Sequence, residues 1–237
     1  MRNACTLIVA VLLAVPWHET QAQGRNFSLA LKGSLTTGSQ IFPHPTSRDE
    51  FERAEFFPVK DILGYGIEFR YRFPESDLAI ALSADYLRKV NSSLRRISSS
   101  VSVPEEDGYR VLPVELTGYF LIPISGEKIG VYMGGGVVTY FGRRIYRFAN
   151  VEASTIDAGN GFGIHVLTGL SWRFNELFSV NAEMKFRDLQ FTSTNQFGAK
   201  QVVFGQTLLN VPQVGDSRIH TDGMIFQIGA VFDFSVF

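Results

Sequence analysis

A histidine inside an alternating apolar segment, His165, is the residue of this chain best placed to act as a general base. Base catalysis would need a nucleophilic hydroxyl within hydrogen-bond reach of the imidazole and a third group that orients the ring. Ser171 shares the same face of the segment, but it lies three inward-facing positions away, too far to be activated. We therefore expect His165 to be structural and assign no catalytic residue.

Two further histidines and a glycine run are the other candidate ligand sites of the chain. His44 and His220 lie in long connections and have no partner at metal-ligand spacing. The glycines at 134–136 are flanked by valines and precede no helix, whereas a phosphate-binding loop opens onto a helix N-terminus. These glycines are expected to bend a strand and clear space beside it. The sequence thus predicts no metal site and no cofactor site.

The chain is expected to consist mainly of β-strands, because eight of its segments alternate between apolar and polar residues with period two. His165 and the glycines at 134–136 lie in two of these segments. The segments span residues 27–35, 63–73, 78–86, 112–122, 129–141, 162–174, 178–186 and 225–237. One face of each segment carries no charge. The other face carries the acids Glu68, Asp85, Glu115, Glu183 and Asp233 and the bases Lys32, Arg70, Arg72, Arg173, Lys185 and Arg187.

The lengths of the connections decide which of the two faces points outward. Connections at 74–77, 123–128 and 175–177 are short, whereas those between them are long, as in membrane barrels with short periplasmic turns. Aromatic residues also gather near both ends of the segments, where two membrane–water interfaces would lie. The sequence therefore predicts an all-β fold, an eight-stranded antiparallel up-and-down transmembrane β-barrel with a charged lumen.

The lumen of so narrow a barrel is expected to be filled by its own side chains. Buried charges must be paired, so the inward acids and bases are interpreted as an ion-pair network, with a proton or ion path as the alternative. Large and small residues should then face each other across neighbouring strands. The expected pairs are Gly169 with Glu183, Gly134 with Thr117, and Gly136 with Glu115.

The ends of the chain carry two targeting signals. Residues 1–22 have Arg2, an apolar run at 7–15 and a small-residue site ending at Ala22, which predicts a secretory signal peptide. That run is far shorter than the roughly 20 residues of a membrane helix. Cys5 lies in this signal, so residues 23–237 form a cysteine-free barrel domain exported to the cell outer membrane.

The segments 111–123 and 130–142, VLPVELTGYFLIP and GVYMGGGVVTYFG, carry a family resemblance. They resemble the central hairpin of small outer-membrane barrels of the OmpA/OmpX kind, in particular the outer-membrane β-barrel domain of Bacteroidetes-like bacteria. The last segment resembles the terminal strand that the outer-membrane assembly machinery recognises. Its lipid-facing phase ends at Phe234, and Phe237 falls out of phase.

One long connection, residues 201–212, could add a hairpin to the structure. If this hairpin joined the barrel wall, the barrel would have ten strands instead of eight. Lys200, Gln206 and Asn210 interrupt any lipid-facing surface, so we expect eight strands in the barrel and a hairpin standing above the membrane.

Basic residues cluster in two other long connections, as Arg88, Lys89, Arg95 and Arg96 and as Arg143, Arg144 and Arg147. Arginine matches phosphate geometry, so these clusters could bind lipopolysaccharide or an acidic polymer. The alternative is a solvated rim whose charge is offset by Glu105, Glu106 and Asp107.

These observations predict a non-enzymatic, monomeric outer-membrane barrel with a structural or surface-interaction role. Its expected partners are outer-membrane lipids, lipopolysaccharide and the assembly machinery. Lys and Arg number 22 against 23 Asp and Glu, so no nucleic acid is expected as a partner. Two alternatives remain, a secreted lipocalin-like ligand-binding barrel and a lipid-modifying enzyme of the outer membrane.

Overall fold

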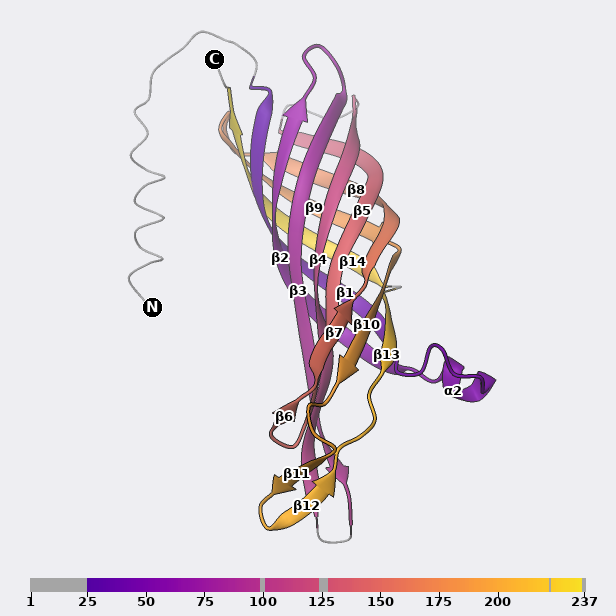
Figure 1. Cartoon of the computed structure of the whole chain (residues 1–237). Helices are drawn as coiled ribbons and strands as arrows, with labels where there is room; N and C mark the ends of the chain where they lie inside the picture. Colours follow the sequence, from indigo (N-terminus) through magenta and orange to yellow (C-terminus); the bar gives the residue numbers. More distant parts are fainter. Residues whose placement is uncertain (1–24, 99–100, 124–127, 222, 236–237) are drawn as a thin grey trace.

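The computed structural model describes residues 25–98, 101–123, 128–221 and 223–235, and the predicted signal peptide lies outside them. Eight antiparallel strands form a closed ring, since the last strand pairs with the first. They are β1 (Phe27–Phe42), β2 (Phe57–Arg72), β3 (Leu78–Arg96), β4 (Ser102–Ile122), β5 (Ile129–Phe148), β8 (Asn160–Arg173), β9 (Phe178–Arg187) and β14 (Met224–Phe234). The predicted eight-stranded barrel is confirmed (Figure 1).

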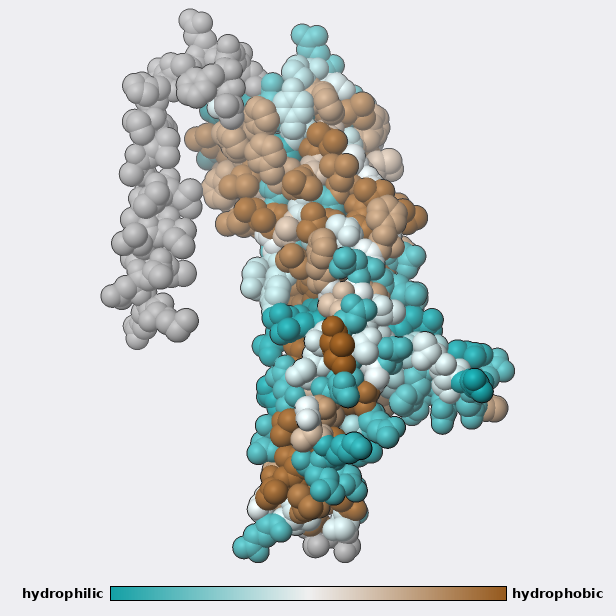
Figure 2. Space-filling view, in the orientation of Figure 1, coloured by the Kyte–Doolittle hydropathy of each residue, from teal (hydrophilic) through white to brown (hydrophobic). Residues whose placement is uncertain are grey.

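The two faces of the barrel wall are as the period-two pattern predicts. Leu63 is 70% exposed and Ile228 is 68% exposed on the outside, whereas Lys185 and Glu115 are buried inside. Figure 2 shows apolar residues across the visible face of the barrel, a mostly hydrophilic surface beyond it, and further apolar residues near the tip. A soluble lipocalin-like barrel would need the reverse arrangement, with an apolar lumen, and that alternative is wrong.

No helix in the described parts of the chain is long and apolar enough to cross a membrane.

Five strands continue well past the apolar band, and the long connections add further strands to them. On one side β3, β4 and β5 extend together with β6 (Val151–Glu152). On the other side the order is β2, β1, β13 (Asp216–Thr221), β10 (Leu189–Gln196) and β7 (Ser154–Ala158). The short helix α2 (Glu50–Ala54) projects sideways (Figure 1). We call this part the extension; the sequence predicted loops here.

The segment 201–212 forms the expected hairpin. Its strands β11 (Gln201–Phe204) and β12 (Thr207–Asn210) pair only with each other, as a separate two-stranded sheet. The hairpin lies at the tip of the extension, far from the short turns (Figure 1). The barrel therefore keeps eight strands, and the ten-stranded count is wrong.

The predicted register is correct for one strand pair and wrong for another. Gly169 lies opposite Glu183, as expected. Between β4 and β5 the register is shifted by two residues, so that Gly136 faces Thr117 and Gly134 faces Tyr119. Barrel stagger shifts one strand along the next, and here it places the bulky Tyr119 ring opposite a glycine. A Cβ on Gly134 would stand 3.2 Å from Tyr119 Cδ1, so this ring needs a glycine as its neighbour.

Candidate functional site

Four charged side chains fill the barrel on the side of the short turns, and we call them the lower cluster. Lys32 Nζ lies 2.5 Å from Glu68 Oε2 and 3.0 Å from Glu183 Oε2. Arg70 Nη2 lies 2.6 Å from Glu68 Oε1 and 3.6 Å from Glu183 Oε1. Each cation contacts both acids, so two positive charges balance two negative charges within the cluster.

Two tyrosines complete the coordination of the lower cluster. Tyr119 Oη donates to Glu68 at 2.8 Å, and Tyr132 Oη donates to Glu183 at 2.9 Å. The Arg70 guanidinium lies 4.0 Å from the centre of the Tyr119 ring. Buried carboxylates that accept several hydrogen bonds keep their charge at lower cost, so these tyrosines stabilise the ion pairs.

A second set of four charges, the upper cluster, lies further from the short turns. Glu115 bridges two cations: its Oε2 is 2.6 Å from Lys185 Nζ and its Oε1 is 2.6 Å from Arg187 Nη2. Arg187 Nη2 also lies 2.8 Å from Asp85 Oδ2. This cluster is again balanced, and together the two clusters confirm the predicted ion-pair network.

Three of the predicted network members stand apart, nearer the short turns. Asp233 Oδ1 accepts a hydrogen bond of 2.6 Å from Ser28 Oγ. Arg72 and Arg173 make no ion pair with any residue that the structure describes. The network thus occupies the middle of the lumen and does not reach this rim.

An apolar cluster covers the upper cluster on the side of the extension. Leu87 and Leu189 follow Asp85 and Arg187 by two residues, so they point inward directly beyond the charges. We call this cluster the plug; its buried members are Ile41, Val59, Ile62, Leu87, Tyr109, Val111, Val138, Tyr140, Leu189, Phe191 and Ile219. The sequence signal for the plug is the change from charged to apolar residues at the inward-facing positions after Asp85. The lumen is therefore filled with charges and closed by apolar side chains.

His165 is buried within this filled lumen. Its Nε2 lies 2.9 Å from Thr117 Oγ1, whereas Ser171 Oγ donates to the Gly130 carbonyl oxygen at 3.4 Å. A hydroxyl–imidazole pair is thus present, but it contains Thr117 and not Ser171. The plug separates this pair from the extension, so a substrate arriving from that side meets apolar side chains first.

The other candidate ligand sites do not assemble. His220 Nε2 lies 3.7 Å from Asp188 Oδ1, and His44 lines a separate cavity in the extension. Among the residues described, no group of three or more His, Cys, Asp or Glu side chains could hold a metal ion. The glycines at 134–136 lie inside β5 and pair with both neighbouring strands, which confirms their predicted role in clearing space.

Comparison with solved structures places this geometry among known folds. The outer-membrane protein OprG from Pseudomonas aeruginosa superposes with a TM-score of 0.53 at 14% identity, over 91% of this chain and 100% of that one. The chain has the fold of a small outer-membrane β-barrel. Other matches are Ail of Yersinia pestis (TM-score 0.44, 13% identity, 89% of this chain and 100% of that one) and Neisserial surface protein A (TM-score 0.46, 11% identity, 88% and 97%). No family model and no curated protein matches the sequence.

The outer-membrane barrel has its apolar band in the lipid and its short turns on the periplasmic side. The extension therefore stands on the outer surface of the cell. The protein is localised in the outer membrane, because an apolar surface that encircles a charged lumen is stable in lipid and not in water.

The predicted basic cluster in β5 does not share one surface of this outer-membrane barrel. Arg144 points inward and forms a bidentate pair with Asp107, at 2.8 and 2.6 Å. Arg147 points outward and contacts Glu106 and Glu152, each at 2.9 Å. The predicted offset of the basic rim by acids is confirmed for these two arginines.

Glu105, the third of the acids predicted to offset the basic rim, also has partners. Arg95 Nη1 lies 3.5 Å from Glu105 Oε1, and the same carboxylate oxygen accepts a short hydrogen bond from Tyr146 Oη. Burial raises the pKa of Tyr146, and the bond to Glu105 raises this pKa further, so the phenol remains a donor. The acidic run 105–107 thus holds β3, β4 and β5 together by ion pairs and hydrogen bonds.

Three of the remaining outward-facing arginines are aligned by the register, whereas Arg96 lies opposite Ser102 near the end of β3. Arg88 in β3 lies directly opposite Arg110 in β4, and Arg110 lies directly opposite Arg143 in β5. We call these residues the arginine row. Sequence reasoning placed Arg88 and Arg143 in separate clusters and missed Arg110, because only the strand register brings the three side by side.

Proposed function

We propose that this chain is a non-enzymatic outer-membrane barrel with a structural or surface-interaction role, exerted through its extension. The observation that carries the proposal is the filled and plugged lumen. Two balanced charge clusters and the plug occupy the barrel interior, so that interaction with other molecules falls to the outer surfaces. We propose that it acts as a monomer, which is supported by a ring that closes within one chain through the pairing of β14 with β1.

The tip of the extension supports a role in contact with other surfaces. Leu94, Val203 and Leu208 are all strongly exposed there, outside the apolar band of the barrel. Exposed apolar side chains on a water-facing surface are typical of sites where proteins meet partners. An apolar cluster beneath them, including Phe148, Phe197 and Leu209, gives the tip a packed core of its own.

Reconstitution in planar bilayers tests the proposal. We expect the wild-type protein to show no stable single-channel steps, because paired charges and the plug fill the lumen. Lipid A should also be identical in cells with and without the protein. Stable conductance would assign a pore function instead, and a new lipid A species would assign the lipid-modifying activity.

The assembly machinery is a proposed partner of the closing strand. Phe234 pairs with Phe27 in β1, and its ring lies 6.0 Å from that of Phe27 and 6.3 Å from that of Phe69. We expect Phe234→Ala to reduce the amount of folded barrel in the outer membrane more than Phe237→Ala, which lies outside the described residues. Heat-modifiable mobility on SDS gels measures this amount, and the opposite ranking would place the recognised aromatic at Phe237.

A further inference from the structure

The arginine row places three positive charges side by side on the outer face of β3, β4 and β5. Side chains directly opposite each other on neighbouring strands have Cβ atoms about 4.5–5.5 Å apart, and like charges in such positions are destabilising. Arg88, Arg110 and Arg143 make no ion pair with any described residue. The nearest outward acid along β4, Glu106, is already engaged by Arg147 at 2.9 Å. Within the described part of the chain, the row is thus a concentrated positive charge without an ion-pair partner.

The height of the row is that of the outer membrane–water interface. Each arginine is the next residue beyond the lipid-facing band on the same face of its strand. Arg88 lies beyond Tyr86, Arg110 beyond Leu112 and Arg143 beyond Phe141. Beyond the row stand Val90, Gly108 and Ile145, which carry no charge. Anionic groups of the outer leaflet lie at this height, and guanidinium forks match the geometry of phosphate oxygens.

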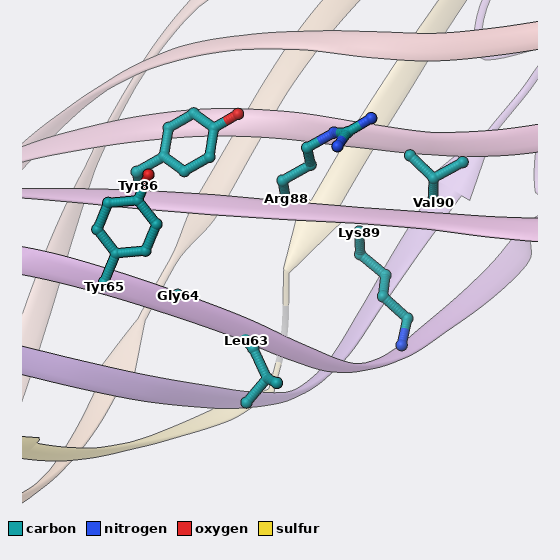
Figure 3. Close-up of a pocket in the computed structure, with 7 residues that line it drawn as sticks. All are labelled: Leu63, Gly64, Tyr65, Tyr86, Arg88, Lys89 and Val90. Carbon is teal, nitrogen blue, oxygen red and sulfur yellow. The ribbon is translucent and has the colours of Figure 1, made fainter. Parts of the chain in front are cut away.

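A groove opens beside the row, where β2 and β3 part. Their ladder ends at Gly64 and Leu87; beyond this point β2 pairs only with β1, and β3 only with β4. The groove has a volume of about 530 Å³ and is lined by Leu63, Gly64, Tyr65, Tyr86, Arg88, Lys89 and Val90 (Figure 3).

The groove is apolar toward the membrane and basic at its outer end. The rings of Tyr65 and Tyr86 lie 5.5 Å apart at its membrane side. In Figure 3, Arg88 and Lys89 point away from each other. Lys89 Nζ reaches the Asp61 carbonyl oxygen at 3.3 Å, on the β2 side of the groove. Arg88 lies directly opposite Arg110 of the row. An amphiphile with an acyl chain and an anionic head matches this division.

We propose that the arginine row and the groove bind one phosphorylated lipid A molecule of the outer leaflet. Its phosphates contact Arg88, Arg110 and Arg143, and one acyl chain lies in the groove against Leu63, Tyr65 and Tyr86. The bound phosphates supply the negative charge that offsets the repulsion along the row. This site is separate from the tip of the extension, so its test does not depend on the surface role proposed above.

The test measures binding of fluorescently labelled bisphosphorylated lipid A to the purified full-length barrel in zwitterionic detergent, by anisotropy. We expect the triple variant Arg88→Gln, Arg110→Gln, Arg143→Gln to bind about tenfold more weakly or worse, since loss of one charge-assisted contact has an effect of that order. The matched control carries Arg95→Gln, Arg96→Gln and Arg147→Gln. It removes the same charge outside the row and should bind within about twofold of wild type.

Competition with unlabelled molecules identifies the ligand. Dephosphorylated lipid A, phosphatidylglycerol and inorganic pyrophosphate should each displace the labelled lipid poorly from the wild-type protein. If phosphatidylglycerol competes as well as unlabelled lipid A, the row binds anionic lipids in general. If pyrophosphate competes equally well, the row is a site for soluble phosphates. Either result overturns the proposal, as does equal loss of binding in the matched control.

A groove variant tests the acyl-chain half of the site. Leu63→Trp should fill the groove and weaken lipid A binding while leaving the row intact, and unchanged binding would remove the groove from the proposal. Heat-modifiable mobility verifies that each variant is folded. A triple Arg→Lys variant of the row keeps the charge but loses the fork, and should bind between wild type and the Gln variant.

Discussion

Replacing Glu115 with Gln is expected to destabilise the barrel by about 3–5 kcal/mol, the usual cost of leaving a buried charge without its partner. Glu115 contacts both Lys185 and Arg187 at 2.6 Å. Arg187 keeps Asp85 after the substitution, whereas Lys185 loses its carboxylate partner within the lumen. The measurement is urea unfolding in lipid vesicles, followed through the fluorescence of Trp172 on the lipid-facing side of β8.

A second substitution distinguishes lost charge balance from lost packing. Adding Lys185→Met to Glu115→Gln removes the surplus cation and leaves Arg187 paired with Asp85. We expect this double variant to recover more than half of the lost stability. Wild-type stability of Glu115→Gln alone would show that the upper cluster contributes little. Failure of the double variant to recover would attribute the loss to packing.

Gly134→Val is the second change for which we expect a large effect. A Cβ at this position would stand 2.7 Å from the Gly118 carbonyl oxygen, a backbone atom that cannot rotate away, and 3.2 Å from the Tyr119 ring. Overpacking of this kind costs about 1–3 kcal/mol or more. It would also displace the ring that donates to Glu68 in the lower cluster. We expect most of the variant to run as the unfolded species on unheated SDS gels.

The neighbouring glycine of β4 supplies the control. A Cβ on Gly118 would have the Gly135 carbonyl oxygen at 3.8 Å as its nearest described neighbour, an ordinary van der Waals distance. Gly118→Val should therefore fold nearly as well as wild type. If both variants fail to fold, β propensity or insertion explains the loss, and clearance for Tyr119 does not.

The eight barrel strands and their two faces were predictable, because lipid on one side and a charged lumen on the other impose a strict period of two. The register between neighbouring strands could be predicted only in part from the sequence. Residue pattern fixes which face Thr117 and Gly136 occupy, but not which of them stand side by side, since barrel stagger shifts one strand along the next. The arginine row was missed for the same reason.

The extension was not predicted, because its strands meet water instead of lipid. In β3 the residues beyond Leu87 are mostly polar or charged on both faces and have the composition of a loop. Long-range pairing with β4, from Arg88–Arg110 to Arg96–Ser102, makes them a strand. Such pairing depends on tertiary context, which outweighs local preference in β-sheets.

The shared course of β3 and β4 has a mechanical consequence. The same two strands run from the lipid into the extension in one register and with no intervening loop. Their pairing is interrupted at Asp85–Tyr86 and Leu112–Pro113, where the proline has no backbone N–H to donate. From Arg88 to Arg96 the strand rises on the order of 30 Å, at about 3.3 Å per residue. The protein thus carries its tip on a stalk of paired strands. A sideways pull on that tip is transmitted along the hydrogen-bonded strands into the barrel wall, and the membrane bears the load.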